Sequence, residues 1–308
     1  MLAGLPGAGK SYFANKMMAE SSLEMVWLSS DKIREEMYGS EDVQGDSSKV
    51  FEEMRRRTEQ ALKEGKNVIY DACNINSKRR IALLKVLKRF SCEKICVICA
   101  TPYEECLKRN SLRERVVPED VIKRMYMTWN TPYYFEGWDD IKIEYAENAK
   151  GFYGSAEEFV EKLMDYQQDT PYHTETLGTH MKGASQYLIE KGGYAQESNM
   201  AIAALIHDCG KPFTKVFHNA KGEETEIAHY YQHQCNGAYD AFFFELPGKD
   251  NNDMLEISVL INLHMHPFGW NDEKKGAKQE SIWGEKLYRD ICKLHEADEA
   301  ASFRAENY

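Results

Sequence analysis

Short apolar runs alternate with longer amphipathic segments through the first half of the chain. The runs that predict strands lie at residues 25–28, 67–70, 95–100 and 141–143. The segments that predict helices lie at residues 12–19, from residue 31 onward, and at residues 51–63. Strands that alternate with helices form a parallel sheet, so this half is expected to be an α/β domain. Only three residues precede Gly4, so a first strand there is expected to be short or clipped.

From about residue 159 the spacing of apolar residues becomes helical throughout. Glycine and proline predict turns at Gly192-Gly193, Pro247-Gly248 and Pro267-Phe268-Gly269. A chain of 308 residues, 43% of them apolar and 12% aromatic, is long enough to build two cores. We therefore predict two domains, an α/β domain with a parallel sheet over residues 1–160 and an all-α domain over residues 161–308.

Composition narrows the class of protein. No stretch approaches the roughly twenty apolar residues of a membrane span, and no secretion signal leads the sequence, so we expect a cytoplasmic protein without a membrane partner. The eight cysteines are then expected to be free thiols, with Cys92, Cys96 and Cys99 in one apolar strand. The net charge of -11 argues against a broad basic surface, so any nucleic acid would have to be gripped locally.

The segment Gly4-Leu-Pro-Gly7-Ala-Gly9-Lys10-Ser11 has the spacing of a phosphate-binding P-loop. Backbone N–H groups of such a loop point at the phosphates, and the helix that follows adds favourable partial charge. Lys10 would bridge the β- and γ-phosphates of ATP, with GTP as the alternative nucleotide, and the Ser11 hydroxyl would bind Mg²⁺. The alternative is a simple glycine-rich turn. Such a turn does not need all the residues of the eight-residue pattern, so the complete pattern favours the P-loop.

Polar residues follow the predicted strands at the end where a parallel sheet binds its ligands. Asp31, in Ser29-Ser30-Asp31, comes directly after the second strand, and Asp71-Ala-Cys73-Asn74 closes the third. Asp31 is placed to accept a proton from an attacking hydroxyl. The alternative is that Asp31 only caps the helix that begins there, which a lone Asp does more often, and both roles are compatible.

Arginines cluster between Lys108 and Arg115, just before Val117-Pro118. Taken alone, such a cluster is more often a solvated helix face. In its order with the P-loop, Asp31-x-x-Arg34 and Asp71-x-x-Asn74, the cluster resembles the lid of the polynucleotide 5′-hydroxyl kinases of phages and bacteria. The resemblance covers residues 4–130, and residues 108–125 are its most specific part.

This resemblance implies roles for individual residues. Asp31 would be the general base for a 5′-hydroxyl, Arg34 and Asn74 would bind the acceptor, and Arg113 would stabilise the transferring phosphoryl group. The remaining lid arginines, expected to contact the nucleotide or the lid, are Arg109 and Arg115. The sequence departs from the family at Tyr12 and Cys73, where threonine is usual, and neither change removes a group that the chemistry needs.

The second half contains an adjacent His207-Asp208 pair on an apolar helix that glycine and proline terminate. A buried ionisable pair is costly unless it is matched, and a metal ion is the simplest match. Further candidate ligands are His180, His233, His264 and Asp298. Any one of these alone is more often a core or surface residue than a ligand.

Together, their order resembles that of the HD phosphohydrolase superfamily, over residues 170–305. The resemblance implies a core metal set of His180, His207, Asp208 and Asp298, with His233 and His264 as ligands of a second metal. Imidazole and carboxylate suit Mn, Fe, Co, Ni or Zn, and such metals would activate water. His173 and Lys211 would hold a substrate phosphate, although Lys211 is equally acceptable as a surface residue. The segments around Tyr172-His173 and Gly237-Ala238-Tyr239 are most similar to HD domains fused to tRNA nucleotidyltransferases and polynucleotide kinases.

The two resemblances together imply an end-healing enzyme for broken nucleic acid, with RNA ends favoured over DNA. The kinase would phosphorylate a 5′-hydroxyl, and the hydrolase would act on a 2′,3′-cyclic phosphate or a 2′- or 3′-phosphate. One alternative is a small-molecule or nucleoside kinase joined to an HD nucleotidase. Another is an HD domain that senses a nucleotide without hydrolysing it.

Overall fold

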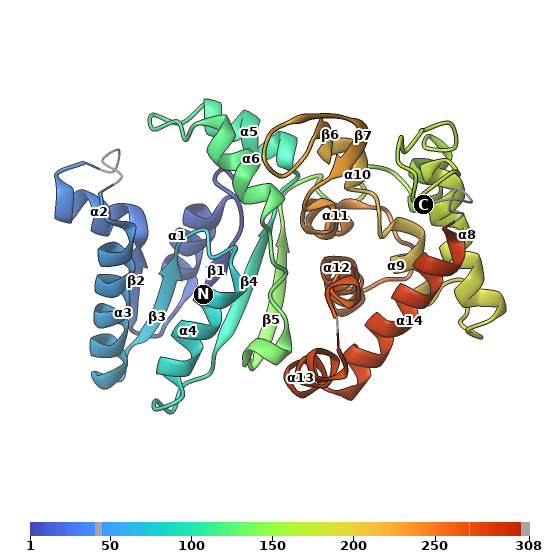
Figure 1. Cartoon of the computed structure of the whole chain (residues 1–308). Helices are drawn as coiled ribbons and strands as arrows, with labels where there is room; N and C mark the ends of the chain where they lie inside the picture. The colour runs from blue at the N-terminus through green and yellow to red at the C-terminus, as the bar shows by residue number, and fades with distance from the viewer. Residues whose placement is uncertain (41–44, 271, 303–308) are drawn as a thin grey trace. The chain divides into compact units, whose positions relative to one another are not determined.

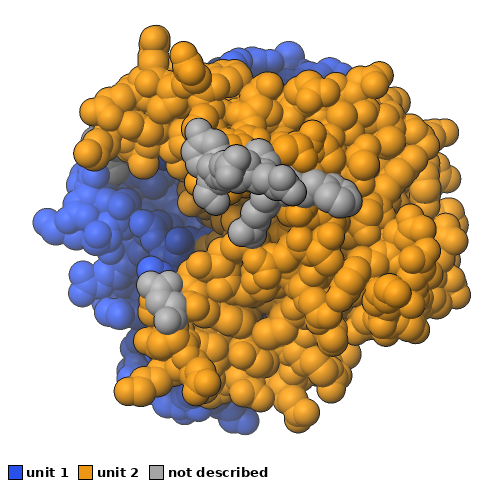
Figure 2. Space-filling view, turned by 45° about the vertical axis from the view of Figure 1, so that its right-hand side comes forward, with its two compact units in different colours: residues 1–125, 132–149 blue, residues 126–131, 150–308 orange. Residues whose placement is uncertain are grey.

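A computed structural model of the chain describes residues 1–40, 45–270 and 272–302 (Figure 1). The chain forms two compact units, which are coloured separately in Figure 2. The first unit comprises residues 1–125 and 132–149, and the second comprises residues 126–131 and 150–308. Among the described residues, none of the helices is both long and apolar enough to cross a membrane.

The first unit is an α/β domain around a five-stranded parallel sheet with strand order β2-β3-β1-β4-β5 (Figure 1). Its strands are β1 (Leu2–Ala3), β2 (Met25–Ser29), β3 (Asn67–Asp71), β4 (Ile95–Ala100) and β5 (Asp140–Tyr145). Its helices are α1 (Lys10–Glu20), α2 (Ser30–Tyr38), α3 (Ser47–Lys63), α4 (Ser77–Leu87), α5 (Tyr103–Ser111), α6 (Glu119–Met127) and the 3₁₀ helix η1 (Tyr134–Glu136). The parallel α/β architecture predicted for this half is confirmed.

Helices bury both faces of this sheet. Side chains of a strand point alternately to its two faces. Ile69 of β3 therefore packs in one apolar cluster with Ala14 of α1, whereas its neighbour Tyr70 packs in another with Val50 and Met54 of α3. Burial on both sides explains why the strands read as continuous apolar runs instead of alternating ones.

Strand β1 is short, as expected, yet it lies in the middle of the sheet between β3 and β4. Leu2 lies opposite Asp71 of β3 and Val97 of β4. The register therefore brings the end of β3 beside the strand that leads into the P-loop. One detail of the strand prediction is wrong, because β4 begins at Ile95 and Cys92 lies outside it.

The second unit is mainly helical. Its helices are α7 (Ala156–Glu161), α8 (Leu177–Glu190), α9 (Asn199–Ile206), α10 (Lys211–Thr214), α11 (His233–Asp240), α12 (Asn251–Leu263), α13 (Glu273–Trp283) and α14 (Glu285–Ala301), with 3₁₀ helices η2 (Ala241–Phe243) and η3 (Pro267–Gly269). Helix α8 packs against α9 and α14, and α12 packs against α9 and α11. These contacts explain why most residues of α9 and α12 are buried.

The prediction of an all-α second domain is wrong in one respect. Strands β6 (Lys215–His218) and β7 (Glu224–Tyr230) form an antiparallel hairpin. Most of its residues are exposed or half-buried, so the segment lacks the apolar run by which a strand is usually recognised.

Residues 126–131 belong to the core of the second unit although they lie within the first half of the chain. Trp129 is fully buried, and its carbonyl accepts a hydrogen bond from Asn262 Nδ2 at 3.1 Å. The Thr131 and Ser258 hydroxyls lie 2.8 Å apart, and the Tyr126 hydroxyl donates to Asp240. The two units therefore do not divide the sequence at a single point.

Candidate nucleotide site and candidate metal centre

The P-loop connects β1 to α1 and takes the conformation that phosphate binding requires. Gly7 and Gly9 have φ of 85° and 86°, a region that other residues rarely adopt. A Cβ on Gly7 would also lie 2.3 Å from the Cys106 carbonyl of α5, so only glycine fits there. Buried Thr101 donates to the Ala8 carbonyl at 3.2 Å, which fixes the loop from the end of β4.

Lys10 and Ser11 open helix α1 at the mouth of this loop. The Lys10 ammonium donates to the carbonyls of Gly4 and Leu5 at 3.1 and 2.8 Å, so it lies folded over the P-loop. Burial by itself would lower the pKa of Lys10, but neighbouring acidic groups, Asp71 among them, outweigh it and raise the pKa. Lys10 therefore stays charged at neutral pH.

Asp71 is a site residue to which we assigned no role from the sequence. It is buried at the end of β3, where its Oδ2 accepts hydrogen bonds from Ser11 Oγ at 3.2 Å and Trp27 Nε1 at 3.1 Å. A carboxylate beside the magnesium-binding hydroxyl of a P-loop is the usual second partner of that ion. Its position, closing the strand next to β1, is the sequence signal that could have identified it.

Asp31 lies in the first turn of α2, and two arginines contact the same carboxylate oxygen. Arg34 Nη1 lies 2.7 Å and Arg115 Nη1 lies 3.0 Å from Asp31 Oδ1. Burial favours the neutral acid, but the two guanidinium groups outweigh it and lower the pKa of Asp31. The prediction that Asp31 caps the helix is wrong, because Ser29 occupies the N-cap position.

In the second unit, six His and Asp side chains from distant parts of the chain meet at one point. His180 lies in α8, His207-Asp208 directly follows α9, and Asp298 lies in α14. His233 begins α11, and His264 directly follows α12. All six predicted metal ligands are buried and lie together.

Asp208 joins two groups within this cluster. Its Oδ2 lies 3.4 Å from His180 Nε2 and 3.3 Å from His207 Nε2, and Asp298 Oδ1 is 3.1 Å from His180 Nε2. Its other oxygen, Oδ1, lies 3.0 Å from His233 Nε2 and 3.8 Å from His264 Nε2. A carboxylate with one oxygen in each group is the arrangement expected of a bridging ligand between two metals.

The orientation of the imidazoles tests whether a cation fits. His207, His233 and His264 each place Nδ1 at 2.7–2.8 Å from the carbonyl three residues earlier, so a neutral ring has its proton on Nδ1. The Nε2 atoms of His180 and His207 are 3.1 Å apart, and those of His233 and His264 are 3.2 Å apart. For His233 and His264, two unprotonated nitrogens at this distance would repel one another, and a metal ion between them would satisfy both. Between His180 and His207, either a proton or a metal ion would do the same. The donor set therefore fits a cation in each group.

Protons compete with a cation for these groups. Burial would lower the pKa of His207, but the Asp208 and Asp298 carboxylates outweigh it and raise the pKa to about 9. Burial, with His207 and His233 nearby, lowers the pKa of His264 to about 3. The first group would thus hold protons when it holds no metal, and metal binding there would release them.

A cavity of about 450 Å³ opens onto this cluster within the second unit. Asp208 and Asp298 line it together with Lys211, His173, Tyr230 and Phe268. Lys211 is buried, and its ammonium lies 2.6 Å from Asp208 Oδ2 and 2.8 Å from Gln168 Oε1. The alternative that Lys211 is a surface residue is therefore wrong.

Comparison with known proteins adds evidence on the first unit. A family profile described as an AAA domain, AAA_33, matches residues 1–132. An L-seryl-tRNA(Sec) kinase of Methanococcus maripaludis is 32% identical over 154 residues, which is 48% of this chain and 59% of that protein. The match thus spans about 59% of the length of the relative.

The N-terminal unit is a P-loop kinase-like domain. Its predicted lid is held by Asn110 of α5, a buried residue whose side chain bonds the Val117 backbone N–H at 3.0 Å and carbonyl at 2.8 Å. These bonds close the loop that carries Arg113 and Arg115. A Cβ on Gly9 would lie 4.0 Å from Arg109 Nη1, so Arg109 reaches the P-loop.

Asn74 contributes to the shape of the kinase-like domain. Its φ of 49° is left-handed, and its Nδ2 donates to the Leu2 carbonyl at 2.6 Å. Arg80 donates to the Asn74 carbonyl at 2.8 Å and forms a fully buried ion pair with Glu136 at 2.6 Å. The loop after β3 is thereby fastened to β1, beside the P-loop. Acceptor binding by Asn74 stays a prediction.

Proposed function

We propose that this chain is a bifunctional end-healing enzyme for nucleic acid, with RNA ends as the favoured substrate. Its kinase-like domain would phosphorylate a 5′-hydroxyl end with ATP and Mg²⁺. Its second unit would be an HD-type phosphohydrolase that removes a 2′,3′-cyclic phosphate or a 2′- or 3′-phosphate. The proposal rests on the two sites described above and on the order of the motifs that form them.

The observation that carries the kinase assignment is the charge around Asp31. Two guanidinium groups, those of Arg34 and Arg115, face one carboxylate oxygen of the expected base. Arg34 Nε is also buried without a hydrogen-bond partner among the described residues. An acceptor phosphate would accept a hydrogen bond from this nitrogen. A polynucleotide carries such a phosphate next to its 5′-hydroxyl, whereas a nucleoside carries none.

We assign the following roles to these groups in the proposed transfer. Asp31 takes the proton of the acceptor hydroxyl as that oxygen bonds to the γ-phosphorus, and the bond from phosphorus to the departing ADP oxygen breaks. Lys10 and Arg113 stabilise the negative charge of the transferring group. Ser11, with Asp71 behind it, would hold Mg²⁺, which neutralises phosphate charge when bound.

The second unit would use its six ligands to hold divalent metals of the Mn, Fe, Co, Ni or Zn class. His180, His207, Asp298 and Asp208 Oδ2 would hold one metal, and His233, His264 and Asp208 Oδ1 would hold the other. When bound, such metals lower the pKa of water and neutralise phosphate oxygens. The adjoining cavity of about 450 Å³ is large enough for one nucleotide, and His173 and Lys211 would contact its phosphate.

A second candidate function comes from the relative in Methanococcus maripaludis. That protein is an L-seryl-tRNA(Sec) kinase, which suggests a hydroxyl on an aminoacylated RNA as the acceptor here. A third candidate function is that of a small-molecule or nucleoside kinase joined to a nucleotidase or to a nucleotide-sensing domain.

A labelling assay separates these acceptors. Purified chain with γ-labelled ATP and Mg²⁺ is offered a 5′-hydroxyl RNA oligonucleotide, the matching DNA, seryl-tRNA and a set of nucleosides. The proposal predicts label on the RNA oligonucleotide above all others. Label on seryl-tRNA or on nucleosides, without label on the oligonucleotides, would contradict it.

A second assay addresses the hydrolase. The chain is loaded with Mn²⁺, Ni²⁺ or Co²⁺, and release of the terminal phosphate is followed on RNA with a 2′,3′-cyclic phosphate or a 3′-phosphate. Metal-dependent release is expected. A chain that binds nucleotides tightly at this unit but releases no phosphate with any of these metals would favour the sensor.

A further inference from the structure

The four histidines of the candidate metal centre are not anchored in the same way. His207, His233 and His264 each contact a backbone carbonyl through Nδ1 at 2.7–2.8 Å. His180 has instead two more distant partners for Nδ1, the Ala301 carbonyl and the Glu175 carboxylate, each at 3.4 Å. His180 is therefore the one cluster histidine whose outer nitrogen faces a charged group in the described part of the chain.

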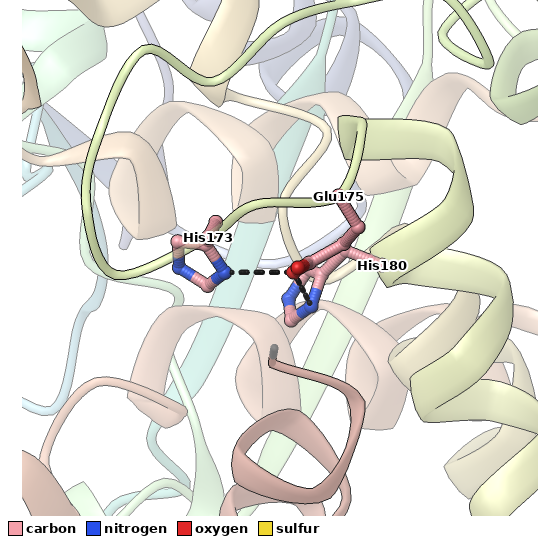
Figure 3. Close-up of side chains that lie close together, drawn as sticks. All are labelled: His173, Glu175 and His180. Atoms are coloured by element: carbon pink, nitrogen blue, oxygen red, sulfur yellow. Dashed lines mark hydrogen bonds and ion pairs between the residues drawn. The ribbon is translucent and has the colours of Figure 1, made fainter. Parts of the chain in front are cut away.

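Glu175 contacts two imidazoles with a single oxygen atom. Its Oε1 lies 3.0 Å from Nδ1 of His173 and 3.4 Å from Nδ1 of His180, as the dashed lines in Figure 3 mark. The Glu175 side chain is only 6% exposed, so water screens these contacts little. His173 lines the cavity, and His180 faces the other ligands through Nε2. Glu175 thus lies behind both a cavity residue and a ligand.

The chemistry of the anchors differs between the two metal positions. A carboxylate that accepts the outer N–H of an imidazole stabilises positive charge on the ring and makes its other nitrogen a stronger donor to a metal. A neutral carbonyl does the same to a smaller extent. Among the residues that the structure describes, the group containing His180 is the one with such a carboxylate, since His233 and His264 both contact carbonyls.

We propose that Glu175 is a positioning residue that makes the metal position at His180 the tighter of the two. This inference rests on the proposed metal centre and extends it to the order in which the positions fill. The first equivalent of metal occupies the group of His180, His207 and Asp298. Because His173 shares the same carboxylate oxygen, occupancy of that position is coupled to a residue of the substrate cavity.

Cobalt titration of the full chain tests the proposal, since Co²⁺ reports its ligands by visible absorption and its affinity by calorimetry. The wild-type chain is expected to bind in two steps. Glu175→Gln keeps the size of the side chain but removes its charge, and it should weaken the tighter step about 10-fold and leave the weaker step unchanged. Glu175→Ala should weaken the tighter step further, towards about 100-fold.

Two single-position backgrounds distinguish positioning from general damage to the fold. With His264→Ala, which leaves the His180 position, Glu175→Gln should show its full effect on Co²⁺ affinity. With His180→Ala, which leaves the His233 and His264 position, Glu175→Gln should have no effect. Glu190→Gln, the same change at the exposed end of helix α8, is the matched control and should bind Co²⁺ as the wild type does.

Equal weakening in both backgrounds, or none in either, would overturn the role of Glu175 while leaving the metal centre intact. A wild-type chain that binds no Co²⁺ would overturn the metal centre itself, and the inference with it. Thermal unfolding of the metal-free variants shows whether each folds as the wild type does.

Discussion

The two candidate sites would neutralise phosphate charge by opposite means. In the kinase-like domain the positive charge belongs to the protein, and it comes from backbone N–H groups, Lys10 and arginines around Asp31. In the second unit the protein supplies carboxylates and imidazoles, and the positive charge would come from metals. One site is thus complete in its charges when the chain folds, whereas the other depends on what it binds.

The two sites also differ in how far apart in the sequence their residues lie. The phosphate cradle lies within eight consecutive residues, so local backbone geometry forms it. The metal ligands span residues 180–298, and three helices and the ends of two others must pack correctly before the ligands meet. We therefore expect substitutions at the first site to act on one step of a reaction, and substitutions at the second to act through metal content.

The largest effect that would test this contrast is expected from Asp208→Ala. Asp208 has one oxygen in each ligand group, so its loss should remove metal from both positions and abolish hydrolysis. Metal content by mass spectrometry and phosphate release measure this, and kinase activity should be unchanged. Loss of kinase activity as well would show that the two sites are coupled.

Lys10→Ala is expected to abolish phosphoryl transfer, by at least about 1,000-fold in kcat, because the γ-phosphate loses its principal cation. Hydrolysis and metal content should be unaffected. The matched control is Lys16→Ala, on the exposed face of the same helix. A Lys10→Ala chain that retains most of its kinase activity would argue against nucleotide binding at the P-loop.

Asp31→Ala should abolish transfer in the same assay without weakening ATP binding, because Asp31 serves the acceptor and not the nucleotide. Measurements of equilibrium ATP binding and of single-turnover phosphoryl transfer separate an effect on nucleotide affinity from an effect on the reaction. A matching loss of ATP affinity would instead place Asp31 on the nucleotide side of the site.

Asp71→Asn should lower kinase activity by about 10- to 100-fold, since Asp71 supports Ser11 as a partner of Mg²⁺. The loss of activity should become smaller as the Mg²⁺ concentration is raised. Initial rates measured over a range of Mg²⁺ concentrations test this. A loss that is independent of Mg²⁺ would point to a role in packing through Trp27 instead.

The smallest effect is expected from Arg115→Ala, and it is a change in pH dependence. Arg115 helps to hold the pKa of Asp31 below its ordinary value, so the base stays ionised and activity falls only as pH drops through that lowered pKa. Removal of Arg115 raises the pKa, so the acid limb of the kinase pH profile should move to higher pH. Lys108→Ala, an exposed change on neighbouring α5, should leave the profile in place.

Much of the kinase-like domain was accessible from the sequence because its signals are local. The strand at Ile95–Ala100 was predicted to the residue, and the others to within one or two at each end. Asp71 was missed as a site residue because its role comes from register with β1, which is not a local property. The hairpin of β6 and β7 was missed because its residues are largely polar.

The sequence by itself determined which residue types are available at each site and, for the P-loop, their geometry, because eight consecutive residues fix one turn and the start of one helix. Only the tertiary structure decided that two arginines share one oxygen of Asp31, that Asp208 joins two groups of ligands, and that Glu175 lies behind His180. These are contacts between elements distant in the chain. Packing alone brings them within a few ångströms, and no local pattern encodes that distance.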